Sequence, residues 1–274
     1  MSAVSLQARP TIIHAESDRR FRETASAMGF NPDDRFIGSY VEWEWGHARH
    51  VFDGAFFSVQ GKHALEFGCH VGGTACVLAA LGARVTGIDP DEKILDLARA
   101  NAARYGLDGR TSFLHVPDTS QLPFGNETFD LVSCISVLQF VPDHLFGAVQ
   151  DELDRVLKPG GHVVVFATSN RIWPREPHHK RWFVNYIPKR LDPILYGKPT
   201  RRGIWPWRIR GGRFSSYRDA SHEDGGRRIL EIKAREDVSP SALRLMTAVN
   251  HLLVPFGAHY GHVSPQIAMV LQKP

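Results

Sequence analysis

The residues best suited to bind a reactive ligand lie in one short run, residues 65–73, which reads LEFGCHVGG. The run follows a predicted strand and opens a predicted helix. Its glycines allow a tight turn and let a ligand approach the backbone. Asp89, 21 residues after Gly68, ends the next predicted strand, where a carboxylate can accept hydrogen bonds from both ribose hydroxyls. The pattern favours a nucleotide-like ligand over a plain tight turn, which is the alternative.

The spacing of the glycines disfavours a dinucleotide. A pyrophosphate site prefers G-x-G-x-x-G, and here His70 stands between Gly68 and Gly72 where the middle glycine would be. Glu66 also lies inside the run. Its carboxylate would repel a pyrophosphate but would suit the cationic end of a ligand.

Strands and helices alternate around this run, which predicts βαβ units and a parallel sheet covered on both faces. Because ligands of such sheets bind outside the carboxyl ends of the strands, these elements place the run and Asp89 on the ligand side. The expected strands are 63–67, 83–88, 111–116, 129–135 and 162–168, and the expected helices are 74–81, 91–105 and 143–157.

The alternation stops after Ser169. Residues 170–227 carry Pro, Trp, Arg and Gly without a clear period. A strand over 228–234, a helix from Ser239 to about Val254 and a strand over 266–272 are expected beyond them. Before the first strand we expect helices over 16–28 and about 39–57, the second rich in aromatic residues.

In these motifs the chain resembles the class I S-adenosylmethionine-dependent methyltransferases. Glu66, Gly68 and Gly72 match the first motif of that family, and Asp89 and Asp118 match its acids after the second and third strands. Residues 122–132 resemble the family's run into the fourth strand, and 157–161 resemble its turn before the fifth. The resemblance covers about residues 61–168.

The resemblance implies a Rossmann-like, doubly wound α/β fold with a mostly parallel, seven-stranded sheet whose last strand runs antiparallel. It implies S-adenosylmethionine as the cofactor, with Glu66 and the glycine turn at the methionine end, Asp89 at the ribose and Asp118 at the adenine. The full expected cofactor set is Glu66, Gly68, Cys69, His70, Gly72, Asp89, Pro90, Asp118, Thr119 and Ser136.

The acceptor is expected to bind segments that follow the fourth and fifth strands. The predicted contacts there are Gln139, Phe140, Asn170 and Arg171, and the aromatic N-terminal stretch adds Trp43 and His47. His178, and after it His179, is predicted as the base that deprotonates an acceptor hydroxyl, because a neutral imidazole can accept a proton near pH 7. Surface histidines and an aromatic helix packed on the sheet are the alternative interpretations.

The predicted organisation is a helical N-terminal extension or lid over 1–60 and a methyltransferase domain over 61–274. Residues 170–227 would be a basic insert on the substrate side. The charge of this region distinguishes it from the rest of the chain, since residues 171–235 contain 17 Lys and Arg but only 6 Asp and Glu. Such a basic segment points to an anionic partner, for example through Arg201, Arg202 and Arg208.

Several classes are disfavoured by the sequence. Its 43% hydrophobic and 23% charged residues are typical of a globular protein, and no apolar run is long enough for a transmembrane helix. Cys69, Cys76 and Cys134 form no CxxC pair, so we expect buried thiols, no metal and a cytoplasmic setting. Neither the Asn/Asp-Pro-Pro-aromatic tetrad of amino-methylating nucleic-acid enzymes nor a Pro-Cys nucleophile is present.

The sequence therefore predicts methyl transfer from S-adenosylmethionine to a small or lipid-linked, anionic acceptor, with peripheral membrane contact as a further expectation. One alternative is an RNA or DNA methyltransferase that uses the basic insert, which the missing motifs disfavour. Another is a cofactor-binding regulatory protein without catalysis. The acceptor atom and the oligomeric state stay open.

Overall fold

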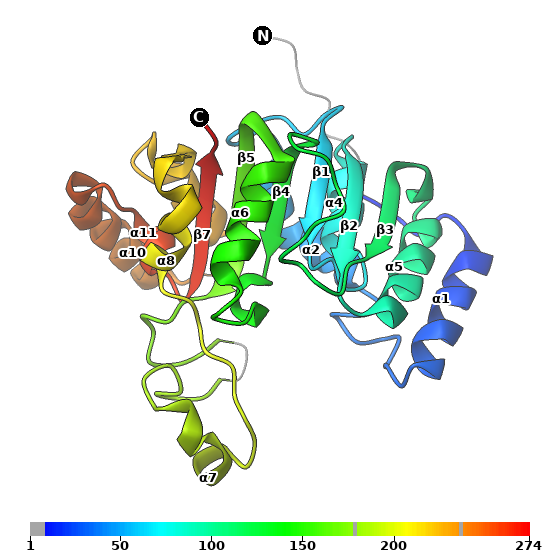
Figure 1. Ribbon diagram of the computed structural model, residues 1–274, viewed down its shortest axis with the longest axis horizontal. Coiled ribbons are helices and arrows are strands. Elements are labelled where there is room, and N and C mark those ends of the chain that lie inside the picture. Colours follow the sequence, from blue (N-terminus) through cyan, green and yellow to red (C-terminus); the bar gives the residue numbers. More distant parts are fainter. Residues whose placement is uncertain (1–8, 178–179, 236–237) are drawn as a thin grey trace. The chain divides into compact units, whose positions relative to one another are not determined.

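The structure is a computed structural model that describes residues 9–177, 180–235 and 238–274. The chain forms two compact units, residues 1–133 and 134–274. The described residues form a seven-stranded sheet with the strand order β3-β2-β1-β4-β5-β7-β6. The expected seven-stranded, mostly parallel sheet with an antiparallel last strand is confirmed. Figure 1 shows the elements along the chain.

The first unit is an α/β assembly with parallel strand pairing. β1 pairs in parallel with both β2 and β4, and β2 pairs in parallel with β3. Its elements are α1 (Ala15–Ala27), α2 (Tyr40–His47), α3 (Arg49–Phe52), β1 (His63–Phe67), α4 (Gly73–Ala80), β2 (Arg84–Asp89), α5 (Glu92–Arg104), β3 (Thr111–His115) and β4 (Phe129–Ile135), the last of which runs into the second unit.

Two helices of this unit show how the sequence sets its layers. α4 is buried along nearly its whole length, as its apolar sequence predicts. α5 begins where the Asp91 side chain accepts a hydrogen bond from the Lys93 N–H, and it buries Leu95 and Leu97. α1 lies beside α5 (Figure 1) and buries Phe21.

The expected single helix over 39–57 is divided in two. α2 ends at His47 and α3 ends at Phe52, and beyond it Asp53 forms an isolated bridge with Ser58. Four buried residues over both helices, Val41, Trp45, Val51 and Phe52, anchor the broken segment. The break therefore leaves these four side chains buried.

The second unit is built on antiparallel pairing. β7 pairs antiparallel with β5 on one side and with β6 on the other. Its elements are α6 (Phe146–Val156), β5 (Leu157–Ser169), α7 (Asp192–Tyr196), α8 (Pro206–Arg210), β6 (Arg218–Asp219), α9 (Arg227–Ala234), α10 (Pro240–Leu253), α11 (Tyr260–Val263) and β7 (Gln266–Gln272).

The expected strand over 228–234 is wrong: the segment is the helix α9. Gly225 and Gly226 both adopt positive φ and start a new direction, and α9 then buries Ile229 and Ile232 on one face. The sixth strand is the two-residue β6 instead. The helix from Ser239 is confirmed, with the Ser239 hydroxyl accepting from the Ala242 N–H.

Candidate functional site

The turn after β1 has the backbone that the glycine run predicts. Gly68, His70 and Gly72 have φ of 73°, 47° and 75°, so the left-handed conformation recurs at every second residue. His70 therefore adopts the backbone that a glycine would take at this position, which a non-glycine residue does at a cost. The N–H groups of Gly68 and Cys69 both donate to the Ile88 carbonyl, at 2.9 Å each, which fixes the turn to β2.

Asp89 connects this turn to the end of β2. Its carboxylate accepts from the His70 N–H and from the Asp91 N–H, at 3.0 Å each. A carboxylate has about four lone-pair positions, so acceptor capacity remains for a ligand. Asp89 is thus oriented by the turn that it would share with the ligand. Pro90, the next residue, accepts a hydrogen bond from the His115 ring through its carbonyl.

Two buried carboxylates lie in the same unit as this turn. Glu66 and Glu44 are 2% and 1% exposed, and Glu66 Oε2 and both Glu44 side-chain oxygens lack a hydrogen-bond partner in the described part of the chain. Burial raises the pKa of Glu44 to about 7 and raises the pKa of Glu66 well above its ordinary value. Buried carboxylates without partners are costly, and a cationic ligand would relieve that cost.

Helix α2 covers the glycine turn. A Cβ at Gly73 would overlap the Tyr40 ring, so the close approach of α2 requires glycine there. Tyr40 also meets His70 edge-on, with 6.4 Å between ring centroids. The nearby negative charges of Glu44 and Glu66, together with burial as the main cause, raise the pKa of Tyr40.

Tyr40 and Glu44 are candidate site residues that the sequence does not predict. They are four residues apart and so share a helix face, and a glutamate between two tryptophans in residues 43–45 was the available signal. The predicted acceptor contacts Trp43 and His47 stack on each other at 4.1 Å. Both are half-buried in α2, and their role toward an acceptor stays a prediction.

The loop after β3 holds Asp118 and Thr119. Asp118 is exposed, and its carboxylate accepts from both the N–H and the hydroxyl of Ser120, which lowers its pKa. Ser136 follows β4 with a φ of 52° and donates its N–H to the Phe166 carbonyl within the second unit. The proposed contacts of these residues with the cofactor remain predictions.

Three of the predicted acceptor contacts, Gln139, Phe140 and Arg171, line one polar cavity of about 190 Å³ in the second unit. Arg201 lies over the Phe140 ring at 3.9 Å. In the described structure neither Arg171 nor Arg201 has a carboxylate within ion-pair distance, and the buried Gln139 Oε1 has no hydrogen-bond partner. The further basic residues that line the cavity are Lys189, Arg202 and Arg208.

Two acids neutralise part of this charge. Arg202 forms a buried ion pair with Asp192 at 2.6 Å, and Asp143 pairs with Arg208 and with Lys189. The cavity that remains is cationic, which suits an anionic group. We call it the arginine cavity below.

The fourth predicted contact, Asn170, is committed elsewhere. It is fully buried, its amide donates to the His262 and Ser264 carbonyls, and its Oδ1 accepts from the Ile172 N–H. It fixes the backbone beside Arg171. The predicted bases His178 and His179 lie outside the described residues, so their role stays a prediction.

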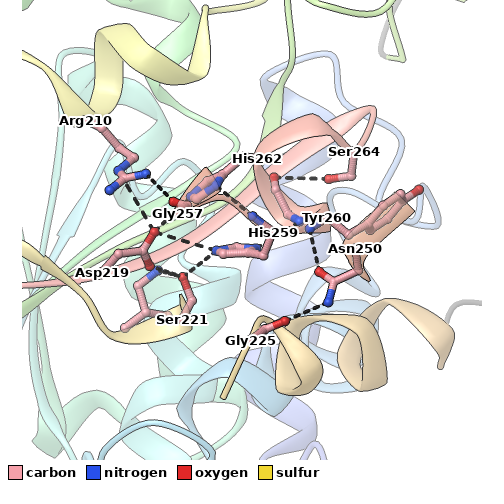
Figure 2. A network of polar contacts seen from close by, with 12 residues as sticks. Arg210, Asp219, Ser221, Gly225, Asn250, Gly257, His259, Tyr260, His262 and Ser264 are labelled. Atoms are coloured by element: carbon pink, nitrogen blue, oxygen red, sulfur yellow. Dashed lines mark hydrogen bonds and ion pairs between the residues drawn. The ribbon is translucent and has the colours of Figure 1, made fainter. Parts of the chain in front are cut away.

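A buried cluster of Asp219, His259 and His262 has the composition of a metal site (Figure 2). Its hydrogen bonds argue for a structural role. The Nδ1 atoms of His259 and His262 accept backbone N–H donors, from Gly261 and His259 respectively. Each neutral ring therefore carries its proton on Nε2, where His262 donates to Asp219 at 2.9 Å and His259 donates to the Ser221 hydroxyl at 3.0 Å. No lone pair is left on Nε2 for a metal ion.

The thiols behave as predicted. Cys69, Cys76 and Cys134 are all buried and form no disulfide. Burial raises the pKa of Cys76 to about 12, which makes it unreactive. Within the described residues, no helix has the length and apolar character needed to cross a bilayer.

Part of the chain is similar to known methyltransferases. Residues 65–165 match a family model described as a methyltransferase domain. The chain is 37% identical over 175 residues to a demethylmenaquinone methyltransferase from Clavibacter sepedonicus, covering 64% of this chain and 65% of that protein. It is 35% identical over 111 residues to a ubiquinone biosynthesis O-methyltransferase from Vibrio cholerae, covering 40% and 43%.

A sterol 4-C-methyltransferase from Caenorhabditis elegans is 32% identical over 107 residues, covering 39% of this chain and 31% of that protein. The chain thus spans between about a third and two thirds of these relatives. An S-adenosylmethionine-dependent methyltransferase from Mesorhizobium loti shares the fold, with a TM-score of 0.51, 17% identity, and coverage of 81% and 95%. Residues 65–165 thus match a methyltransferase domain, and the chain shares its fold with an S-adenosylmethionine-dependent methyltransferase.

Proposed function

We propose that this protein transfers a methyl group from S-adenosylmethionine to a small-molecule acceptor that carries an anionic group. The observation that carries the proposal is the pair of buried carboxylates, Glu44 and Glu66, beside the glycine turn. Both oxygens of Glu44 and Oε2 of Glu66 lack hydrogen-bond partners in the described part of the chain. The cofactor has a cationic amino-acid end and a sulfonium, and these charges complement that pair. Asp89 would hold the ribose hydroxyls.

The bound cofactor supplies an already activated methyl group, so the residues of this chain have three tasks. They bind the cofactor, align the acceptor and exclude water. Tyr40 and α2 cover the glycine turn and keep this part of the unit dry. Well-oriented positioning can lower a barrier by about 7–11 kcal/mol, so no further activation of the methyl group is required.

The anionic character of the acceptor rests on the arginine cavity. Arg171 and Arg201 have no carboxylate partner, and burial lowers the pKa of both. A guanidinium without a carboxylate partner is a place where an anion binds well. The relatives are named for quinone and sterol substrates, which supports a small-molecule, lipid-linked acceptor here.

The direct test is label transfer. Purified protein is incubated with methyl-labelled S-adenosylmethionine and with fractions of a cell extract, separated into lipid-soluble and water-soluble compounds. We expect a labelled product that needs the wild-type protein and is retained by an anion-exchange resin. Glu66→Ala should abolish labelling, and Glu23→Gln on the exposed face of α1 is the matched control.

The alternatives give different results. Tight cofactor binding without label transfer to any fraction would support a regulatory cofactor-binding protein. Label in added RNA or DNA, with steep salt dependence, would support a nucleic-acid methyltransferase.

A further inference from the structure

The segment from Asn170 to Arg201 exposes large apolar side chains. In the described residues, Ile194 and Leu195 of α7 are 80% and 53% exposed, and Trp182 and Phe183 are 58% and 56% exposed. Figure 1 shows that this part of the second unit extends away from β5 and β7, with α7 at its far end. A soluble surface rarely exposes so many large apolar groups together without a partner.

The charges on the same segment have one sign. Residues 171–201 contain eight Lys and Arg and only two acids, Glu176 and Asp192. Both acids are buried, at 2% and 1% exposure, so the charges that reach solvent from the described part of the segment are basic. The exposed basic side chains are Arg175, Lys180, Lys189, Arg190, Lys198 and Arg201.

The segment is folded, so these side chains are held outward. Arg202 pairs with the buried Asp192 at the start of α7, and its guanidinium also donates to the Ile187 carbonyl at 2.9 Å. Asn185 donates to the Trp173 carbonyl at 2.9 Å and accepts from the Gly203 N–H at 2.8 Å. These buried hydrogen bonds and the ion pair hold the base of the segment in place. The exposed apolar side chains of the segment therefore do not pack into a core.

We propose that this surface docks the protein on an anionic lipid bilayer. Aromatic side chains favour the interface of a membrane, aliphatic side chains enter the boundary of the acyl chains, and Lys and Arg attract anionic headgroups. The surface combines all three. A nucleic acid would use the basic and aromatic groups, but it offers nothing to Ile194 and Leu195. A cavity of about 510 Å³ lined by Trp173, Pro174 and Trp182 hollows the same surface.

The experiment is co-sedimentation with vesicles, using the full chain. One set is phosphatidylcholine alone, and the other contains about a third phosphatidylglycerol. We expect binding only to the anionic set, weakened by salt. The double variant Ile194→Glu/Leu195→Glu should lower the partition coefficient about ten-fold or more, and Arg190→Glu/Lys198→Glu should do the same by removing headgroup attraction.

The matched control is Leu252→Glu/Phe256→Glu. These two side chains are 72% and 84% exposed in the same unit, at the end of α10 and just beyond it, and lie outside the proposed surface. We expect this control to bind vesicles as the wild type does. Equal cofactor affinity in all variants, measured by calorimetry, shows that each one folds.

Three results would overturn the proposal: no binding to anionic vesicles, loss of binding in the Leu252→Glu/Phe256→Glu control to the same extent, or binding that survives Ile194→Glu/Leu195→Glu. An RNA oligonucleotide that binds wild type and the Ile194→Glu/Leu195→Glu variant equally, while vesicles bind neither, would assign the surface to nucleic acid. The vesicle experiment does not depend on methyl transfer, so its failure leaves the proposed function standing.

Discussion

At the scale of single residues, the proposed cofactor site contains acids in two different environments. Asp89 accepts hydrogen bonds from two backbone N–H groups, which orient its carboxylate beside the turn. Glu44 and Glu66 are buried without such donors, and burial raises the pKa of each. Without a cationic ligand the Glu44–Glu66 pair favours bound protons. The hydrogen-bonded carboxylate of Asp89 and the buried carboxylates of Glu44 and Glu66 lead to different predictions for cofactor binding.

The first prediction concerns the pH dependence of cofactor binding. The pKa of Glu44 is raised to about 7, so between its ordinary 4.5 and about 7 the ligand-free protein binds more protons here than the unfolded chain. A cationic cofactor favours the ionised form. Affinity for S-adenosylmethionine should therefore rise as pH increases from about 6 to 8, with release of up to about one proton. Calorimetry in buffers of different ionisation enthalpy measures that proton number directly.

Glu44→Gln should bind more weakly at pH 8 and show a flatter pH profile. Glu23→Gln, an exposed change on α1, should reproduce the wild-type profile. The groups that face Glu44 are Tyr40 on its own helix and Glu66 on β1. An unchanged slope in Glu44→Gln would assign any pH dependence to Glu66 alone.

The second prediction concerns the contribution of Asp89 to cofactor binding. Asp89→Asn keeps the volume of the side chain and one acceptor for the turn but removes the charge. Loss of a charge-assisted contact with the ribose should weaken S-adenosylmethionine binding by about 1.5–3 kcal/mol. Asp96→Ala, on the exposed side of α5, is the control and should leave the affinity unchanged. Wild-type affinity in a folded Asp89→Asn protein would remove Asp89 from the cofactor site.

At the scale of elements, the sequence predicts the βαβ half well because each element there has a single strong pattern. β4 and β7 occupy the expected ranges, and Asp91 caps α5 as expected. Residues 228–234 were mispredicted because Ile229, Leu230 and Ile232 fit both a strand and a helix, and only packing against the rest of the unit decides between them. β6 has two residues, too few for any periodic signal.

The position of β6 is instead set by buried side chains. Asp219 accepts from His262 Nε2 at 2.9 Å, and Ser221 also contacts both Asp219 and the backbone N–H of Val270. These bonds connect β6, α11 and β7 around one carboxylate. Such long-range pairing leaves no local pattern, which is also why Glu44 escaped prediction while Glu66, inside a motif, did not.

This network makes stability dependent on pH. Burial is the main cause that lowers the pKa of His262 from 6.5 to about 4. The unfolded chain then binds more protons than the native state between these values. Neutral His262 therefore stabilises the native state fully above about pH 6.5. As pH falls from there towards 4, the free energy of unfolding decreases by about 3 kcal/mol.

Chemical denaturation at several pH values measures the effect. His262→Gln should be less stable than wild type at pH 7.5, and the difference should shrink as pH falls to about 4.5. His251→Gln, which replaces an exposed histidine of α10, should keep the wild-type pH dependence. A constant difference between His262→Gln and wild type at all pH values would mean that His262 does not titrate as burial requires.

At the scale of the whole molecule, the candidate functions divide between the two compact units. The glycine turn, Asp89 and the orphaned carboxylates belong to residues 1–133, and the arginine cavity and the exposed segment around α7 belong to residues 134–274. The residues that match the methyltransferase domain model, 65–165, lie mostly in the first unit. The second unit carries most of the basic charge, so the features that would select an acceptor lie outside the recognisable motifs.

This division predicts separable effects on the two substrates. Arg171→Gln/Arg201→Gln removes the two guanidinium groups without carboxylate partners and leaves the first unit untouched. Losing charge-assisted contacts worth about 1.5–3 kcal/mol each should raise the acceptor KM at least ten-fold. The affinity for S-adenosylmethionine should stay within about two-fold, since all its proposed ligands except Ser136 belong to the other unit. Arg244→Gln, an exposed change on α10, should alter neither quantity. Titration calorimetry gives the cofactor affinity, and label transfer at varied acceptor concentration gives KM. If the folded Arg171→Gln/Arg201→Gln variant also lost cofactor affinity, both substrates would depend on the same residues. The acceptor KM would then not report on the arginine cavity alone, and the predicted separation would be wrong.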